Sequence, residues 1–189
     1  MAQDAIADVV KQDWEKATAY SLTDEDIERA KLLLGADVAS REREYIQTAT
    51  TDNIRNFAHG CGNDNPLHCD PEYGETTRWG SVIAPSMMAG VINKPLLGDP
   101  MSADLKARTK SLFRGIHVFV SGGEWTFYRP VYPGDTIYSF KGEETLEVNP
   151  SEFAGRNVMQ VRRDVKFNQR GEVVVLMENP IFFRRGAGA

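Results

Sequence analysis

Residues 158–177 read VMQVRRDVKFNQRGEVVVLM, and this stretch decides the fold. Val158 to Phe167 and Val173 to Met177 are rich in β-branched and apolar side chains, which is typical of strands. The segment Asn168-Gln169-Arg170-Gly171 between them has the composition of a tight turn. We therefore predict an antiparallel β-hairpin near the C-terminus.

More strands are predicted upstream of this hairpin, and helices are predicted before them. Apolar and aromatic runs at residues 116–120, 125–128 and 137–140 are typical of strands. The predicted helices cover residues 5–17, a segment from the N-cap Thr23 to about Leu34 with Gly35 as C-cap, and a segment from Thr51-Asp52 to Gly60. Helices followed by a run of antiparallel strands predict an α+β domain.

The segment after Pro85 has a different pattern. Residues 86–92 are apolar almost all round, and proline suits the first turn of a helix, so we predict a buried helix that begins near Pro85. Pro95 interrupts or ends this helix. Residues 98–114 are mostly polar, which predicts a long connection with about one helical turn.

Length and charge limit the class of protein. The chain has 189 residues and a net charge of −5, which predicts one main domain and argues against a nucleic-acid partner. We divide it into an N-terminal helical extension (1–21), the domain (22–185) and a flexible tail (186–189). No apolar stretch approaches the roughly 20 residues that cross a bilayer, and a signal-peptide pattern is lacking, so we expect a cytoplasmic protein without membrane contact. Two cysteines predict reduced thiols rather than a disulfide framework.

The polar turn at residues 61–70, CGNDNPLHCD, carries the candidate chemistry. A histidine such as His68 can transfer protons at neutral pH, and Asp64 is an acid nearby. Asn63 and Asp64 can instead cap the turn through hydrogen bonds to the backbone, as Asn65-Pro66 can. The spacing of His59, Cys61, His68 and Cys69 matches no standard metal pattern, so we expect no metal site.

Four motifs in order carry a family resemblance: a helix ending in Phe57-Ala58, the turn Gly62 to His68, the segment Gly80 to Met87, and the phrase Phe127 to Thr136. Together they resemble the MaoC-like, or (R)-specific enoyl-CoA hydratase, family, in a version similar to the FAS1-like dehydratase N-terminal domain. The resemblance implies a single hot-dog domain, in which an antiparallel sheet wraps around a long central helix starting near Pro85. It also implies that two hot-dog domains pair, as a homodimer or as a heteromer with a second MaoC-like subunit.

The resemblance also implies residue roles. The family adds water to α,β-unsaturated acyl thioesters, or removes it, and its substrate brings its own coenzyme A, so no cofactor is expected. His68 matches the family histidine, Asn63 stands where the family has its aspartate, and Ser86 matches the glycine whose N–H polarises the thioester carbonyl. An amide cannot accept a proton at neutral pH, although it can orient a water molecule.

The substitution at Asn63 leaves more than one interpretation. The first is an enoyl-CoA hydratase or 3-hydroxyacyl-CoA dehydratase that uses His68 and Asn63, with Asp64 as a possible replacement acid. The second is a non-catalytic hot-dog subunit that forms the acyl pocket for a catalytic homologue, including one for bulky acyl groups such as a steroid side chain. A thioesterase is disfavoured, because its usual acid is not recognisable after Pro85.

Overall fold

The structure is a computed structural model and describes residues 22–38, 46–92, 94–95, 101–113, 116, 118–151 and 155–184. The helix predicted over residues 5–17, the extension 1–21 and the tail 186–189 lie outside the described residues.

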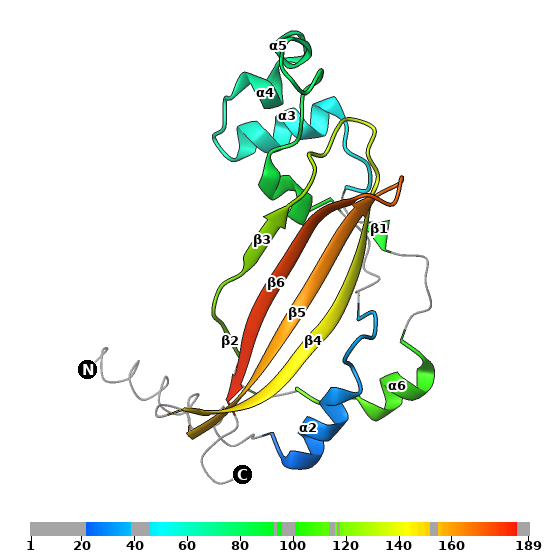
Figure 1. Ribbon diagram of the computed structural model, residues 1–189, viewed down its shortest axis with the longest axis vertical. Coiled ribbons are helices and arrows are strands. Elements are labelled where there is room, and N and C mark those ends of the chain that lie inside the picture. The colour runs from blue at the N-terminus through cyan, green and yellow to red at the C-terminus, as the bar shows by residue number, and fades with distance from the viewer. Residues whose placement is uncertain are drawn as a thin grey trace, which may run out of the picture.

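A six-stranded sheet forms the body of the molecule (Figure 1). Its strands are β1 (Lys94–Pro95), β2 (Val118–Val120), β3 (Glu124–Phe127), β4 (Ile137–Ser151), β5 (Gly155–Asn168) and β6 (Val173–Arg184). The order is β1-β4-β5-β6-β2, and β3 also pairs with β6. All pairs are antiparallel except the short pairing of β1 with β4. The α+β class and the antiparallel sheet are therefore confirmed.

The predicted hairpin is the β5–β6 pair. Its register places Asp164 opposite Met177 and Lys166 opposite Val175. Gly171 has a φ of 77°, a left-handed conformation that glycine adopts without steric cost, and its N–H donates to the carbonyl of Asn168. The strands extend well beyond the predicted segments, since β4 runs to Ser151 and β6 to Arg184.

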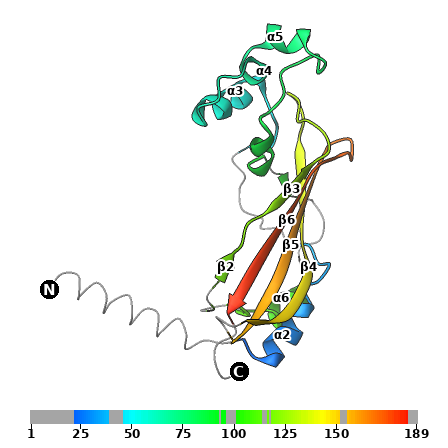
Figure 2. The ribbon, with the colours of Figure 1, turned by 60° about the vertical axis from the view of Figure 1, so that its left-hand side comes forward.

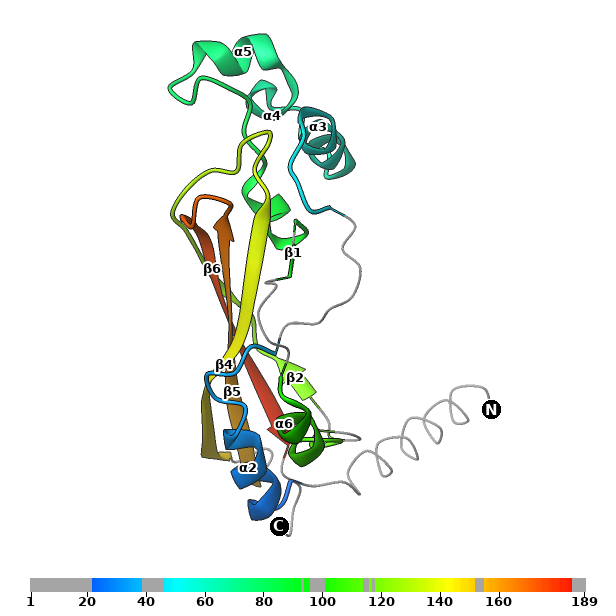
Figure 3. The same cartoon turned by 90° about the vertical axis from the view of Figure 1, so that its right-hand side faces the viewer.

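The helices gather at the two ends of the sheet (Figures 1 and 3). They are α2 (Asp24–Lys31), α3 (Thr51–Gly60), α4 (Pro66–Cys69), α5 (Pro71–Thr76), α6 (Ala103–Arg108) and the 3₁₀ helix η1 (Ser86–Gly90). Helices α3, α4 and α5 form a group at one end, whereas α2 and α6 lie beside the other end. The caps of α2 and α3 are capping boxes at Thr23 and Thr50.

Helix α2 is shorter than predicted. It ends at Lys31, and the N–H of Gly35 donates to the carbonyl of Glu143 on β4 rather than closing the helix. Pairing with the sheet therefore takes the chain away from helical geometry before Leu34.

The long central helix predicted after Pro85 is wrong in length. The chain forms only the five-residue η1 and then enters β1. The Nζ atom of Lys166 on β5 lies 3.4 Å from the carbonyl oxygen of Gly90 and 3.2 Å from that of Ile92, so the sheet supplies donors to the end of the helix. Pro95 has no N–H with which to continue it. The sheet consequently packs against a short helix.

Three apolar clusters make up the core of the described residues, and the third, Ala30, Leu33 and Leu112, adjoins the second. Ile54 of α3, Met88 of η1, Ile137 of β4 and Val175 of β6 belong to the cluster near the α3–α5 group. A second cluster joins α2 to the far ends of β5 and β6, where the rings of Phe113 and Phe183 stack at 4.3 Å. The core is therefore divided along the length of the sheet.

A polar row lies on the inner face of the sheet, which is the face of β4–β6 that η1, α2 and α6 cover. Ser139 donates to Asp164 at 2.6 Å, and Lys141 lies 3.7 Å from the same carboxylate. Glu143 is only 4% exposed, and its nearest cationic atom, Nε of Arg162, is 3.8 Å away. Burial raises the pKa of the Glu143 carboxyl, while the charge of Arg162 opposes that shift only in part.

This raised pKa predicts the pH dependence of stability. The folded protein holds the Glu143 proton more tightly than the unfolded chain, so this group's stabilisation is complete below its unfolded pKa and is lost as pH rises through its folded pKa. Glu143→Gln removes that titration. Relative to the native protein, the variant should gain free energy of unfolding as the pH rises above the unfolded pKa of about 4.3, measured by urea unfolding.

The matched control is Glu147→Gln, an exposed position on the same strand, which should leave the pH dependence unchanged. Parallel stability curves for the native protein and Glu143→Gln would contradict the prediction.

Candidate active site

Two asparagines shape the polar turn. Oδ1 of Asn63 accepts a hydrogen bond from the N–H of Asn65 at 3.0 Å, and Oδ1 of Asn65 accepts one from the N–H of Leu67 at 3.0 Å. Asn65 thereby caps α4, with Pro66 in the first turn. The predicted turn role of these residues is confirmed, and the turn places His68 on α4.

The ring of His68 is held by the backbone. Its Nδ1 lies 2.7 Å from the carbonyl oxygen of Ile83. A carbonyl oxygen only accepts hydrogen bonds, so Nδ1 carries the hydrogen, and Nε2 of the neutral ring keeps its lone pair. The side chain is half-buried. This arrangement suits a proton acceptor whose ring orientation is fixed.

The strand-like segment that contains Ile83 links His68 to Ser86. The N–H of Ile83 donates to the carbonyl of Leu67 at 3.2 Å, and that of Ala84 donates to Val131 at 2.9 Å. Gly74 of α5 packs directly on this segment, because a Cβ atom there would lie 2.4 Å from the backbone nitrogen of Val82. The position of the Ile83 carbonyl, which accepts the hydrogen bond from His68, therefore depends on the close packing of Gly74 against this segment.

A cavity of about 220 Å³ lies beside the start of η1, and we call it the first cavity. Ser86 is the first residue of η1, is exposed, and lines this cavity. The first N–H groups of a helix have no partner within the helix, so that of Ser86 is placed to donate to a bound group. The lining residues are Trp79, Ile83, Ala84, Pro85, Ser86, Ala89, Phe127, Tyr128, Arg129, Pro130, Val131 and Val174.

The predicted site residues differ in how they lie relative to the first cavity. His68 does not itself line the first cavity, but it is bonded to Ile83, which does. Asn63 is half-buried, and its Oδ1 is engaged by the turn. Asp64 is exposed, and no ion pair or hydrogen bond joins it to another described residue. The roles of His68, Asn63, Asp64 and Ser86 stay predictions.

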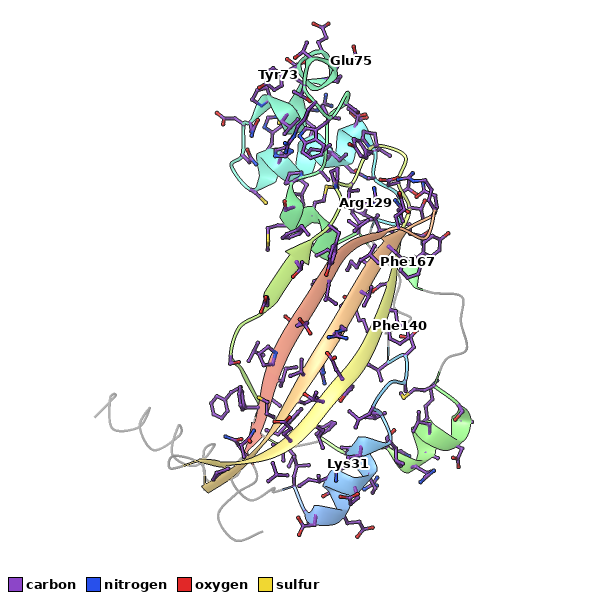
Figure 4. The ribbon with its side chains drawn as sticks, viewed as in Figure 1. Lys31, Tyr73, Glu75, Arg129, Phe140 and Phe167 are labelled. Carbon is purple, nitrogen blue, oxygen red and sulfur yellow. The ribbon has the colours of Figure 1, made fainter. Side chains whose placement is uncertain are left out.

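Sequence reasoning missed the aromatic wall of the first cavity. Trp79, Phe127 and Tyr128 all line it, and the guanidinium of Arg78 lies 4.3 Å from the centre of the Trp79 ring. Arg129 lies where the sheet meets the α3–α5 group (Figure 4). Phe127 and Tyr128 come directly before Arg129 in the sequence, and these adjacent aromatic residues were the available signal.

Asp135 has a structural role in the loop that follows β3. It is buried, accepts the N–H of Tyr132 at 2.9 Å, and pairs with Arg170 at 3.0 Å. It therefore holds the loop after β3, which forms one side of the first cavity.

Across the described part of the chain, no three His, Cys, Asp or Glu side chains are grouped so that they could hold a metal ion. Cys61 and Cys69 are both free thiols. None of the described helices has the length and apolar character needed to cross a membrane.

The family follows from a match that includes this site. The model of the FAS1-like dehydratase domain region matches residues 37–177, which include α3–α5, η1 and most of the sheet. The chain belongs to the FAS1-like dehydratase family. It is also 28% identical over 124 residues to the UPF0336 protein of Streptomyces avermitilis, a match that covers 66% of this chain and 76% of that relative.

Solved structures show the same fold. The ChsH1-ChsH2 complex from Mycobacterium tuberculosis contains a chain with a TM-score of 0.65 and 21% identity, covering 88% of this chain and 96% of that one. The MaoC-like dehydratase from Rhodospirillum rubrum has a TM-score of 0.52 and 20% identity, with coverage of 82% and 99%. The fold of this member of the FAS1-like dehydratase family is thus the hot-dog fold of MaoC-like dehydratases, as the resemblance implied.

The packing of Gly74 generates a test of how the His68 site is built. In Gly74→Ala the new methyl group would meet backbone atoms of Ser81 and Val82, so the segment that carries Ile83 must shift. We expect a loss of about 1–3 kcal/mol in the free energy of unfolding and a changed environment of the His68 ring. Urea unfolding and the ¹⁵N NMR signals of His68 measure the two effects.

Gly60→Ala is the control, because no atom lies within 4 Å of the added Cβ at the end of α3. An unchanged His68 spectrum in Gly74→Ala would show that the segment does not position the ring.

Proposed function

We propose that this protein is a hydro-lyase for acyl thioesters, adding water to an enoyl-CoA or removing it from a 3-hydroxyacyl-CoA. The observation that carries the proposal is the His68 ring, whose Nδ1 is fixed by Ile83 and whose Nε2 is left as a proton acceptor. Membership of the FAS1-like dehydratase family supports the reaction class. The proposal includes a cytoplasmic location and no cofactor, since the substrate carries coenzyme A.

Each site residue has a distinct role in the hydration direction. Nε2 of His68 accepts a proton from water as the water oxygen bonds to C3 of the enoyl group, and the ring then returns a proton to C2. The N–H of Ser86 donates to the thioester oxygen, which carries negative charge in the enolate. Asn63 holds the water through its Nδ2, since its Oδ1 already accepts the N–H of Asn65.

A second candidate function is a non-catalytic hot-dog subunit that completes the acyl pocket of a catalytic homologue. Asn63 favours it, because its amide acts in the turn and offers no basic group where the family has a carboxylate. The likeness to one chain of the ChsH1-ChsH2 complex, which has two different subunits, also supports it. An acyl group as bulky as a steroid side chain is part of this second proposal.

The exposed edge of the sheet supports a partner in both cases. Strands β2 and β3 both pair with β6, and along their other side the described part of the chain supplies no strand (Figure 2). Val118, Phe119 and Val120 of β2 and Phe127 of β3 are exposed there. An unpaired edge with apolar side chains is suited to pairing with a second hot-dog domain.

Substitutions at the site test the hydratase. His68→Ala should lower kcat for enoyl-CoA hydration by about a hundredfold to ten-thousandfold, because the proton acceptor is lost. Asn63→Asp should raise kcat, because a carboxylate at this position restores a second proton acceptor. Both are measured with the chain alone and with any co-purifying hot-dog homologue.

The control is His59→Ala, an exposed histidine on α3 that should keep full activity. Full activity in His68→Ala would overturn the hydratase mechanism. In the alternative outcome, the chain alone shows no hydration activity, and activity is restored only by the homologue. If His68→Ala then has no effect on the activity of that mixture, the protein is the non-catalytic subunit.

The sheet edge makes a separate prediction about assembly. Val120 is 69% exposed on β2, and Val120→Lys places an ammonium group where the partner strand would pack. Association with a second copy or a homologue should weaken by about tenfold or more, measured by light scattering after size exclusion. Tyr73→Lys, exposed on α5 far from this edge (Figure 4), should leave association unchanged. Equal weakening by both variants would count against the edge as the interface.

A further inference from the structure

A second and larger cavity lies on the inner face of the sheet. Its volume is about 530 Å³, against about 220 Å³ for the first cavity, and we call it the inner-face cavity. Residues of β4, β5 and β6 line one side, and Leu33, Met101 and Phe113 are among those that line the other. A cavity of this size can hold a substantial part of a small ligand.

The two cavities follow one another along η1 and β6. Ala89 lines the first cavity, whereas the next residue, Gly90, lines the inner-face cavity. On β6, Val174 lines the first and Met177 the second. The two cavities therefore adjoin successive residues of η1, the helix that begins at Ser86.

The inner-face cavity is polar where an acyl chain would end. Glu143, Arg162 and Asn179 lie side by side on β4, β5 and β6, and all three line it. The Oε2 atom of Glu143 is buried and has no hydrogen-bond partner among the described residues. A buried oxygen left without a partner destabilises the fold, and a bound group that bonds to this atom would remove that cost.

The charges around Glu143 select the kind of group that could bind it. Arg162, Arg163 and Lys141 are cationic and line the cavity, and Asp164 adds a second carboxylate. Arg163 is already paired with Glu144 at 2.6 Å and with Glu178 at 2.8 Å. Asp164 is already bonded to Ser139, whereas Glu143 is not closely paired. A ligand anion would face the two carboxylates, and a ligand cation would face the basic groups. An uncharged oxygen can accept from Arg162 or Asn179 and can also bond to the Glu143 carboxyl.

We propose that the inner-face cavity binds the far end of the acyl group, and that this end carries an uncharged oxygen, a hydroxyl or a ketone, recognised by Glu143 with Arg162 and Asn179. The inference rests on the proposed acyl-thioester function. Burial favours the protonated form of the Glu143 carboxyl, because it raises the pKa of that group. In that form its O–H can donate a hydrogen bond to a ketone oxygen.

Binding measurements test the proposal independently of catalysis. Enoyl-CoA thioesters of one chain length are compared by calorimetry, one fully apolar and the others with a single keto or hydroxyl group moved along the far half of the chain. The whole protein, with its partner if one co-purifies, should bind the best oxygenated ligand about tenfold more tightly than the apolar one, a difference of about 1.4 kcal/mol.

The variants identify the recognising group. Glu143→Leu should abolish the preference, whereas Glu143→Gln should keep most of it, because an amide still forms hydrogen bonds. Glu147→Leu, on the exposed part of the same strand, is the matched control and should keep the preference. If Glu143→Leu does not fold, Arg162→Met replaces it, since that side chain is about half exposed, and it should weaken the preference.

The outcomes separate this inference from the hydratase proposal. Hydration activity with equal affinity for apolar and oxygenated chains would overturn the inference alone. A preference that Glu143→Leu leaves intact would also overturn it. A preference that is lost in Glu143→Leu would support the inference. If the protein also lacks hydration activity, that result would overturn the hydratase proposal in favour of a binding subunit.

Discussion

A buried lysine sets the architecture around the site. Lys166 is 1% exposed on the inner face of β5, and its Nζ reaches the carbonyl oxygens of Gly90 and Ile92. An ammonium group is costly to bury unless acceptors surround it, and the carbonyls at the end of a helix lack partners within the helix. The ammonium group and the helix carbonyls therefore satisfy one another, and they hold the sheet to the end of η1 beside Gly90, which lines the inner-face cavity.

The candidate active site is built from backbone groups more than from side-chain pairs. The Asn63 and Asn65 turns place His68 on α4, and the Ile83 carbonyl then selects the protonated ring nitrogen. Ile83 also begins the short segment that ends at Ser86. The His68 ring and the N–H of Ser86 are thus positioned by one piece of chain, which makes the site sensitive to packing at Gly74.

Features with a local cause were predictable. The β5–β6 hairpin follows from strand-forming residues around a glycine turn. Helix α3 was predicted with its observed end at Gly60, because apolar periodicity and a polar start occur together, but its N-cap is Thr50 rather than Thr51-Asp52. Helices α4 and α5 were missed, since at four and six residues they are too short to show periodicity. The end of α2 was misplaced because the N–H of Gly35 pairs with Glu143, a residue far away in the sequence.

The hot-dog class, the sheet and the place of His68 in a capped turn follow from the sequence, because each depends on patterns within a few residues or on motifs in a fixed order. The tertiary structure decided the length of the helix after Pro85, the tautomer of His68 and the burial of Glu143 with its Oε2 atom lacking a hydrogen-bond partner among the described residues. Each of these depends on a contact between distant segments: Lys166 with Gly90, Ile83 with His68, and β4 with β5. An apolar run such as residues 86–92 suits a long helix and a short one equally well, and only the donors and acceptors that surround it in the fold distinguish them.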